Sequence, residues 1–366
     1  MSGPPPLLHP MDGCGYRRFW KHYIQNWPYN LRSLYVRLFA LLVVTVRLPG
    51  VWLEGRKHNA KIAAEPLDEG PVFVVGHWRS GTTYLHNLLS QDPRFACISF
   101  SRSVFPLDCL GKVRPARSVM QLLIPKTRGM DKIALDADTP QEEEIAFGAL
   151  GDICFYKSFY FPRKLDRHFR RSVLMEDLLP GEREKLAADY RYVAQKMAYV
   201  GEGKPVLFKN PASTARMAFL KGVFPNAKFI HIVRDPYAVY PSMMNLWGRL
   251  LQAFSWQKTK GIDFSEATFS VYERTMRAHL ADRANIPEND FHEVRFEDLE
   301  ADPVAAVAGI YDALGLHGKT EAMVPIQAYI DTQQGYKKNS HLPDPSLKAK
   351  IAERWGFAFE NWGYDE

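Results

Sequence analysis

A twelve-residue segment, VFVVGHWRSGTT (residues 72–83), constrains the fold more than any other part of the chain. Its four apolar residues, Val72 to Val75, predict a buried strand, and apolar residues three and four apart after Gly81 predict an amphipathic helix. Gly76 and Gly81 bracket the loop between these elements. Such a turn presents backbone N–H groups and the positive end of a helix to an anion. The segment therefore predicts a phosphate-binding loop in an α/β fold.

The side chains of this loop differ from those of a nucleotide hydrolase. The glycine spacing is that of a Walker A loop, but Thr82 stands where that motif requires a lysine. Arg79 can supply the positive charge, and the hydroxyls of Ser80, Thr82 and Thr83 add hydrogen-bond donors. An ordinary ATP or GTP hydrolase is therefore disfavoured. The alternative interpretation is a glycine-rich turn in which a Ser or Thr caps the helix.

At these residues the chain resembles the sulfotransferases that use 3'-phosphoadenosine 5'-phosphosulfate (PAPS). It is similar to the branch that carries RSGTT where the soluble aryl and steroid enzymes carry KSGTT. The resemblance covers about Val72 to Trp355 and implies a P-loop-type three-layer α/β fold with a central parallel sheet flanked by helices. It also implies that the donor is bound by the loop residues Arg79, Ser80, Gly81, Thr82 and Thr83.

A second segment, FIHIVRDPYAVYPS (residues 229–242), supports the resemblance. Its apolar residues predict a strand that ends at Arg234, and Ser242 follows eight residues later on an expected helix. In the family an Arg and a Ser at this spacing bind the 3'-phosphate of the donor, so the resemblance gives Arg234 and Ser242 this role. The planar fork of arginine suits two phosphate oxygens. The alternative is a surface ion pair between Arg234 and Asp235 or Asp298.

Lys209 ends a third apolar segment, PVLFKNP (residues 205–211). Ligands of open α/β sheets lie beyond the carboxyl ends of the strands, so we expect its amine in the same crevice as Arg79. The tyrosylprotein branch of the family places a catalytic lysine after a comparable strand. The alternative is an exposed lysine that merely ends a strand.

Two further segments match the family more weakly. In HEVRFEDL (residues 292–299), Phe296 stands where many relatives have Tyr, so a hydroxyl contact with adenine is lost although ring stacking could survive. The segment GYKKNSHLP (residues 335–343) resembles a basic segment that covers the donor in relatives. It makes Tyr336, Lys337 and Lys338 candidates for donor binding, and a solvated loop is the equal alternative.

The reaction needs a base that takes the proton from the attacking hydroxyl. The segment DADTPQEEEIAF (residues 136–147) resembles a Pro-Gln-Glu-acid-Glu segment of bacterial and algal members. Thr139 as N-cap, Pro140 at the first helical position and Glu142 three residues after the cap form a capping box, so these acids could simply begin a helix. On such a helix Glu142 would share a face with Ile145 and project inward. Burial would raise the pKa of Glu142 toward that of a general base.

Other bases are less favoured, and the mechanism needs no metal. Glu144, about 200° around the expected helix from Glu142, is the second candidate, and His77 and His231 are lesser ones. In the expected reaction the acceptor hydroxyl attacks the donor sulfur in line while Arg79 and Lys209 stabilise the growing charge. The sequence contains no cluster of His, Cys or carboxylates at metal-ligand spacing.

Composition agrees with an enzyme of this class. The 366 residues, 46% hydrophobic, can bury a large core, and we expect an N-terminal extension (residues 1–70) followed by one α/β domain (residues 71–366). The net charge of +6 favours anionic ligands, and no nucleic-acid motif accompanies it. The four cysteines lack paired CxxC spacing, so the reducing cytoplasm is the expected location.

Residues 16–52 differ from the soluble sulfotransferases by mixing many aromatic side chains with arginines and lysines. This composition is typical of an interfacial membrane helix, and the alternative is an amphipathic helix packed on the domain. The apolar run Leu38 to Val46 is too short to span a bilayer, which needs about 20 residues. Aromatic residues between the motifs, such as Phe155 and Trp247, could line an apolar acceptor pocket.

These observations predict a sulfotransferase that moves a sulfuryl group from PAPS to a hydroxyl of an apolar alcohol, sterol, phenol or lipid. Two alternatives stay open at this point. A P-loop kinase would share the fold and the anion-binding loop, and a non-catalytic peripheral membrane protein would follow if the basic, aromatic N-terminus were the working part. The sequence does not indicate an oligomeric state.

Overall fold

The computed structural model describes residues 6–110, 136–333 and 343–365. The chain divides into two compact units whose segments alternate along the sequence. Unit 1 consists of Met1–Pro66, Ile98–Tyr199 and Leu246–Ile262, and unit 2 consists of Leu67–Cys97, Val200–Asn245 and Asp263–Glu366. The boundary expected near residue 70 lies close to the first change of unit, and the expected two-domain division stays a prediction.

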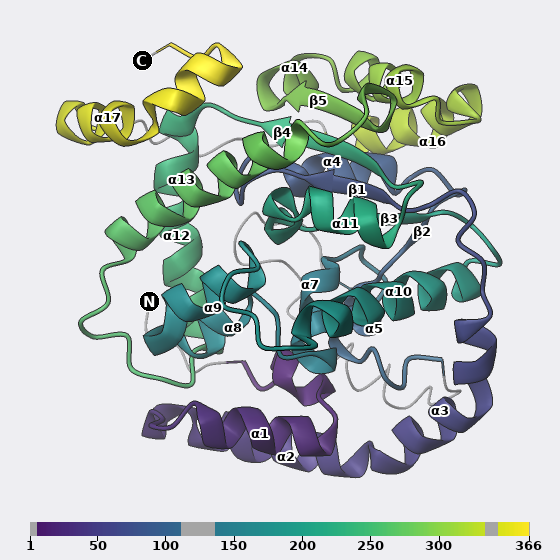
Figure 1. Cartoon of the computed structure of the whole chain (residues 1–366), viewed down its shortest axis with the longest axis vertical. Coiled ribbons are helices and arrows are strands. Elements are labelled where there is room, and N and C mark those ends of the chain that lie inside the picture. The colour runs from purple at the N-terminus through teal and green to yellow at the C-terminus, as the bar shows by residue number, and fades with distance from the viewer. Residues whose placement is uncertain (1–5, 111–135, 334–342, 366) are drawn as a thin grey trace. The chain divides into compact units, whose positions relative to one another are not determined.

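Unit 2 contains a five-stranded parallel sheet, as expected (Figure 1). The strand order is β2-β3-β1-β4-β5, so β1 lies in the middle and pairs with both β3 and β4. The expected first strand is confirmed with the same bounds. The strands are β1 (Val72–Val75), β2 (Ala96–Cys97), β3 (Val206–Lys209), β4 (Lys228–Val233) and β5 (Phe291–Arg295).

Alternate residues of β1 pack into different layers of unit 2. Val72 and Val74 lie in a core cluster with apolar residues of the helices α4 (Thr82–Leu89), α14 (Phe296–Ala301), α15 (Pro303–Leu314) and α16 (Lys319–Thr332). Between them, Phe73 stacks on Phe208 and Phe229 of the neighbouring strands, with ring centroids 5.3 and 5.5 Å apart. Because side chains alternate along a strand, this stack lies on the opposite face, near Phe224 at the end of α11 (Met217–Val223).

A second apolar cluster of unit 2 joins the end of β4 to the C-terminal helix. Trp355 is buried in it and stacks on Tyr272 at a centroid distance of 3.9 Å. The cluster is formed by Val233, α12 (Pro236–Phe254), α13 (Phe264–Arg283) and α17 (Pro345–Trp362). The shorter 3-10 helices of this unit are Pro211–Ala215 and Glu288–Asp290.

Unit 1 is helical in the residues that the structure describes. Its elements are the 3-10 helices Pro10–Gly13, Leu31–Ser33 and Pro162–Lys164 and the helices α1 (Tyr16–Gln25), α2 (Leu34–Val46), α3 (Leu48–Ala63), α5 (Phe100–Val104), α7 (Glu143–Leu150), α8 (Lys157–Tyr160), α9 (Leu165–Ser172) and α10 (Glu182–Val200). A buried ion pair joins two of them, because Lys196 Nζ on α10 lies 2.5 Å from Glu54 Oε1 on α3.

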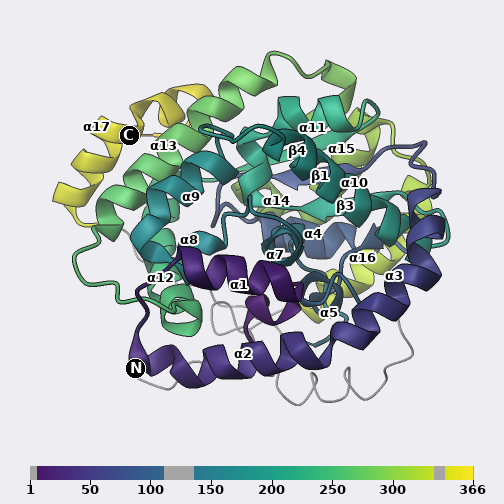
Figure 2. The same ribbon diagram turned by 60° about the horizontal axis from the view of Figure 1, so that its bottom comes forward.

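The N-terminal segment forms three α-helices, whereas the sequence predicted a single interfacial or packed helix. In Figure 2, α1 lies alongside α2, and α2 leads into α3. Among the described residues no single helix is long and apolar enough to cross a membrane. The segment Leu31–Val46 and the helix Leu48–Ala63 meet the criteria of length and composition only as a pair, which is bent by 43°.

Candidate functional site

The loop after β1 approaches its neighbours so closely that its first glycine cannot carry a side chain. Gly76 has φ 145°, and a Cβ there would lie 2.4 Å from the carbonyl oxygen of Ile232 on β4. Its N–H donates a hydrogen bond to Thr214 Oγ1 at 2.8 Å, which fixes the loop against the adjacent 3-10 helix. The loop is therefore held rigidly at the carboxyl end of the central strand, and α4 begins directly after it at Thr82.

The second glycine of the loop is packed against an aromatic ring. Gly81 has φ 99° and is the N-cap residue of α4. A Cβ at this position would lie 2.2 Å from Cδ2 of Phe296, the first residue of α14 after strand β5. The helix N-terminus, where backbone N–H groups lack partners within the helix, thus lies beside this ring.

The cations expected to bind the donor are brought together with Ser242. Arg79 Nε donates to Ser242 Oγ at 2.8 Å, and Arg234 donates to the Arg79 carbonyl at 3.2 Å. The Arg234 guanidinium also lies over the ring of Phe296, 4.3 Å from its centroid. Arg79 itself has φ 73°, an uncommon conformation for a residue other than glycine. Arg79, Arg234, Ser242, Phe296 and Gly81, which we call the cation cluster, come from four separate places in unit 2, because Arg79 and Gly81 share the loop after β1.

Lys209 and the loop hydroxyls lie at the same edge of the sheet. Because all strands are parallel, the ends of β1, β3 and β4 meet at one edge, and Lys209 pairs in register with Val74. Lys209 is 1% exposed, so the alternative of a solvent-exposed lysine is wrong. Ser80 and Thr82 are buried, and Thr83 is half-buried. The candidate residues Tyr336, Lys337 and Lys338 lie outside the described residues.

The first candidate base, Glu142, lies in unit 1 but not on a helix. Helix α7 begins at Glu143, and Glu142 is its N-cap residue with extended backbone angles of φ −78° and ψ 132°. The Tyr156 hydroxyl donates to Glu142 Oε2 at 2.8 Å. Glu142 is buried, as expected, and a tyrosine hydroxyl orients its carboxylate.

The expected capping box at Thr139 is wrong. The Thr139 and Gln141 backbones instead pair with the chain near residue 99: Phe100 N–H donates to the Thr139 carbonyl and Gln141 N–H donates to the Ile98 carbonyl, each at 2.8 Å. These bonds hold residues 139–141 extended and delay the start of the helix. Consequently Glu142 does not share a helical face with Ile145. The expected angle of about 200° between Glu142 and Glu144 also does not apply, because Glu142 lies outside the helix.

The second candidate base, Glu144, is engaged in the local structure of unit 1. It is buried, and its carboxylate accepts a hydrogen bond from the backbone N–H of Phe155. Its backbone carbonyl accepts one from the Cys154 thiol at 3.1 Å. Both contacts hold the loop after α7, which indicates a structural use of this side chain.

His77 does not have the environment of a general base. Its ring is fully buried, and Nδ1 donates to the Trp78 carbonyl at 2.8 Å. Burial lowers the pKa of His77 to about 3. The imidazole is therefore neutral near pH 7 and inaccessible, so it is a poor candidate for moving protons during the reaction.

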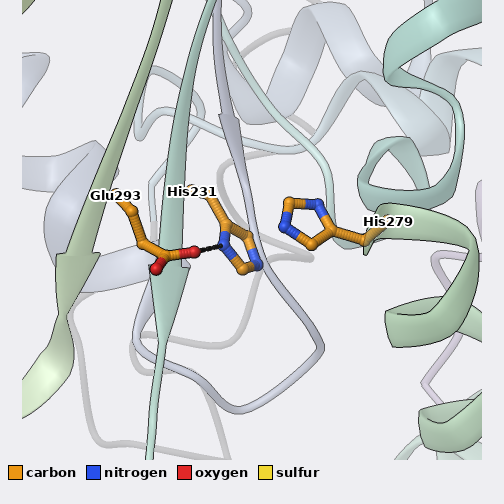
Figure 3. Close-up of side chains that lie close together, drawn as sticks. All are labelled: His231, His279 and Glu293. Carbon is orange, nitrogen blue, oxygen red and sulfur yellow. Dashed lines mark hydrogen bonds and ion pairs between the residues drawn. The ribbon is translucent and has the colours of Figure 1, made fainter. Parts of the chain in front are cut away.

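His231 belongs to a group of three titratable side chains in unit 2 (Figure 3). Its Nδ1 donates to Glu293 Oε2 at 2.7 Å, and Trp362 Nε1 donates to the same oxygen at 3.0 Å. The rings of His231 and His279 are stacked with centroids 3.7 Å apart and planes inclined by 27°. The lone pairs of imidazole lie in the ring plane, so two stacked rings do not converge on one ion. The arrangement is a hydrogen-bonded network that joins β4, β5 and α17.

The parallel sheet, the glycine-bracketed loop and the cations at its edge define a P-loop-like enzyme that transfers an anionic group. The chain belongs to the sulfotransferase family, because residues 71–320 match the family described as Sulfotransferase family. It is 32% identical to the omega-hydroxy-beta-dihydromenaquinone-9 sulfotransferase Stf3 of Mycobacterium bovis and to that of Mycobacterium tuberculosis. Each match extends over 360 residues, 96% of this chain and 90% of the relative.

Solved structures agree on the fold. Sulfotransferase STF9 from Mycobacterium avium is similar with a TM-score of 0.70 at 20% identity, covering 93% of this chain and 89% of that one. Sulfotransferase STF1 from Mycobacterium tuberculosis has a TM-score of 0.61 at 18% identity, covering 96% and 94% of the two chains. The expected enzyme class and fold are confirmed, and the kinase and the non-catalytic membrane protein are no longer needed as explanations.

Two side chains of the site were not assigned from the sequence. The lost hydroxyl contact of Phe296 with adenine stays a prediction, and the structure adds that its ring packs against Gly81 and lies 4.3 Å from the Arg234 guanidinium. The other is Tyr156, whose hydroxyl donates a hydrogen bond to Glu142. The segment HEVRFEDL contained a signal for the first, because it places Phe296 directly after a strand. Nothing in the sequence indicated the second.

Proposed function

We propose that this enzyme transfers the sulfuryl group of PAPS to the terminal hydroxyl of a lipid acceptor. The observation that carries the donor assignment is the cation cluster, in which Arg79, Arg234 and Ser242 are joined by hydrogen bonds beside a helix N-terminus. Two guanidinium groups can bind several phosphate oxygens, each through more than one N–H. The ring of Phe296 adds a flat apolar surface suited to stacking with a base.

The lipid acceptor is proposed from the relatives. Stf3, which is 32% identical over nearly the whole chain, is named for an omega-hydroxylated menaquinone derivative. A terminal hydroxyl on a long apolar chain fits the range of apolar acceptors expected from the sequence. The aromatic residues considered as pocket walls, Phe155 and Trp247, are fully buried and packed at 6.3 Å between centroids, so they support the core of unit 1 and do not argue for an acceptor.

We further propose Glu142 as the general base. Its burial and its hydrogen bond from Tyr156 give it a fixed orientation, which a base needs more than it needs a particular pKa. Glu142 removes the acceptor proton while the hydroxyl oxygen attacks sulfur, and the bond from sulfur to the phosphate oxygen of the donor breaks. The leaving group is 3'-phosphoadenosine 5'-phosphate.

Charge compensation completes the proposed mechanism. Lys209 and Arg79 stabilise the negative charge that develops on the sulfuryl and bridging oxygens, and Arg234 with Ser242 holds the 3'-phosphate. Transfer of this kind depends chiefly on position and fixed charge. The expected independence from metal ions stays a prediction, as does the cytoplasmic location.

The decisive experiment is calorimetric binding of 3'-phosphoadenosine 5'-phosphate to wild type and to Arg234→Ala, without magnesium and with ATP as the control ligand. We expect micromolar or tighter binding that weakens by about 10–150-fold in the variant, because a charge-assisted contact is worth roughly 1.5–3 kcal/mol. Arg249→Ala, an exposed arginine on the same helix as Ser242, is the matched control and should bind normally.

Transfer is then measured with labelled PAPS and an omega-hydroxylated isoprenoid quinol. Product formation that is lost in Glu142→Gln, with binding of the desulfated product intact, is the expected result. A preference for ATP would refute the donor assignment. Transfer to a phenol or a sugar but not to the quinol would refute the acceptor assignment while leaving the donor assignment in place.

A further inference from the structure

Helix α2 of unit 1 carries apolar side chains on two opposite faces. One face is buried and contains Val36, Ala40 and Val44, with the buried Arg37 beside them. The other is exposed, and residues on it lie two positions from the buried ones, about 200° around the helix. These exposed side chains are Leu34, Leu38, Leu42 and Val46. An exposed apolar face of this kind calls for a second apolar environment, which the part of the chain that the structure describes does not supply.

The exposed face continues on both sides of α2. Leu31 precedes it at 82% exposure, and the first two turns of α3 expose Leu48, Trp52 and Leu53. We call these four residues together with Leu34, Leu38, Leu42 and Val46 the apolar stripe. Among the described residues, every exposed large hydrophobic side chain except Leu179 and Val324 lies between Leu7 and Leu53. This concentration distinguishes the stripe from the scattered apolar residues of an ordinary surface.

Positive charge is concentrated around the same helices. Residues 16–63 contain nine lysines and arginines and one acid, Glu54, and so carry eight net positive charges. The whole chain has 47 basic and 41 acidic residues, so the rest of it is slightly negative. Glu54 is buried in an ion pair with Lys196, so its carboxylate adds no negative charge to the surface. Exposed basic residues flank the stripe at Arg17, Arg32, Arg56, Lys57 and Lys61.

The composition of α3 indicates a helix that lies in the interface. Its first half exposes apolar residues, and its second half exposes Arg56, Lys57 and Lys61. The Arg56 guanidinium lies 4.9 Å from the ring centroid of Trp52, and tryptophan rings are enriched at the depth of lipid headgroups. A bilayer-spanning arrangement would place these three cations in hydrocarbon, where each is costly.

We infer that the apolar stripe docks unit 1 on a bilayer that contains anionic lipids. Leucine and tryptophan side chains enter the boundary between headgroups and acyl chains, and the flanking arginines and lysines meet the lipid phosphates. If the acceptor is the proposed membrane lipid, this docking holds the enzyme at the surface that contains it.

The test compares two double variants of the full chain. Leu38→Glu/Leu42→Glu alters two stripe residues that are 58% and 59% exposed, and Leu179→Glu/Val324→Glu alters the two exposed apolar residues outside the N-terminal region. Cosedimentation is measured with vesicles of phosphatidylcholine containing phosphatidylglycerol, and with vesicles of phosphatidylcholine alone. Burying half a leucine is worth roughly tenfold in partitioning, so the stripe variant should bind on the order of 100-fold more weakly. The control variant should bind like wild type.

The charged flank has its own expected result. Arg56→Gln/Lys57→Gln should weaken binding to the anionic vesicles by about 30-fold, at roughly 1 kcal/mol per cation, and should leave binding to phosphatidylcholine vesicles nearly unchanged. Urea unfolding and binding of 3'-phosphoadenosine 5'-phosphate verify that each variant is folded. Equal vesicle binding by the stripe variant and wild type would overturn the inference. The inference would also be overturned if wild type formed a dimer that did not bind vesicles and the stripe substitutions converted this dimer to a monomer.

Activity separates this inference from the proposed function. The stripe variant should lose transfer to an acceptor embedded in vesicles and retain it with a short-chain, water-soluble hydroxyl acceptor. If wild type transfers sulfuryl groups to neither acceptor, the proposed function fails while the vesicle measurements still decide the docking surface. If the stripe variant loses transfer to both acceptors equally, the docking role in catalysis is refuted.

Discussion

Replacing Gly81 with alanine should destabilise the fold and weaken donor binding through one contact. The residue has φ 99°, and an added Cβ would lie 2.2 Å from Cδ2 and 2.8 Å from Cε2 of Phe296, with Ile232 Cδ1 at 3.3 Å. Phe296 cannot retreat without moving relative to the Arg234 guanidinium, 4.3 Å from its centroid. The substitution therefore strains the backbone and pushes the cation cluster apart.

The magnitude has two parts. A left-handed conformation costs a residue other than glycine roughly 1–2 kcal/mol, and overpacking by one methyl group costs about 1–3 kcal/mol. Gly81→Ala should thus lower the free energy of unfolding by about 2–5 kcal/mol. Gly315 offers a matched control in unit 2, because it has φ 59° and a Cβ there would have no neighbour within 4 Å. Gly315→Ala should show only the cost of the left-handed backbone conformation, roughly 1–2 kcal/mol.

The assay is urea unfolding followed by tryptophan fluorescence, combined with calorimetric binding of 3'-phosphoadenosine 5'-phosphate. We expect Gly81→Ala to cost about 1–3 kcal/mol more than Gly315→Ala and to weaken binding, which Gly315→Ala should not affect. Measured against a Phe296→Ala reference, Gly81→Ala should lose most of this extra cost, since the ring that an added Cβ would meet is gone. Equal costs for the two glycine variants, or a cost unchanged by Phe296→Ala, would refute the close approach of ring and loop.

Three further predictions concern other parts of the chain. Glu142→Gln should lower kcat by about 10²–10⁴-fold and leave binding of 3'-phosphoadenosine 5'-phosphate unchanged. Tyr156→Phe should move the acid limb of the pH profile of kcat to higher pH, because the hydrogen bond from Tyr156 favours the charged carboxylate of Glu142. An unchanged pH profile would exclude this hydrogen bond from catalysis. His77 has its pKa lowered from 6.5 to about 3, so only the unfolded chain binds its proton between these values and stability falls as the pH drops below 6.5. Lowering the pH from 6.5 to 4.5 should cost roughly 2 kcal/mol through this residue, and unfolding of His77→Gln should lack that part of the pH dependence. Lys196→Met should cost about 3–5 kcal/mol because it leaves Glu54 buried without its partner, and Glu54→Leu/Lys196→Met should recover most of it, as measured by thermal unfolding.

The elements around the loop could be predicted because their signals are local. The strand Val72–Val75 and the helix that begins at Thr82 follow from apolar periodicity and two glycines, and the structure has both. The sequence also predicts that Arg234 follows the end of a strand and that Ser242 lies on the next helix, and both are confirmed. Because the strands of the predicted sheet are parallel, these segments are expected to meet at the carboxyl-terminal edge of the sheet.

Contacts between distant segments account for what the sequence could not predict. The helix expected from the capping box at Thr139 is delayed because the backbone near Ile98 offers hydrogen bonds that no local pattern reveals. The packing of Phe296 on Gly81 joins residues 215 positions apart in the sequence, and its signal appears only once β5 is known to lie beside β4. The burial of Lys209 likewise depends on the neighbours that the sheet provides.

The alternation of the two units along the chain has a consequence for how this enzyme can diversify. Every member of the cation cluster, together with Lys209, belongs to unit 2, whereas Glu142 and the apolar stripe belong to unit 1. We therefore expect insertions and substitutions in Ile98–Tyr199 to accumulate without disturbing the grip on a shared cosubstrate. A library that varies this segment while sparing Glu142 should therefore retain binding of the cosubstrate.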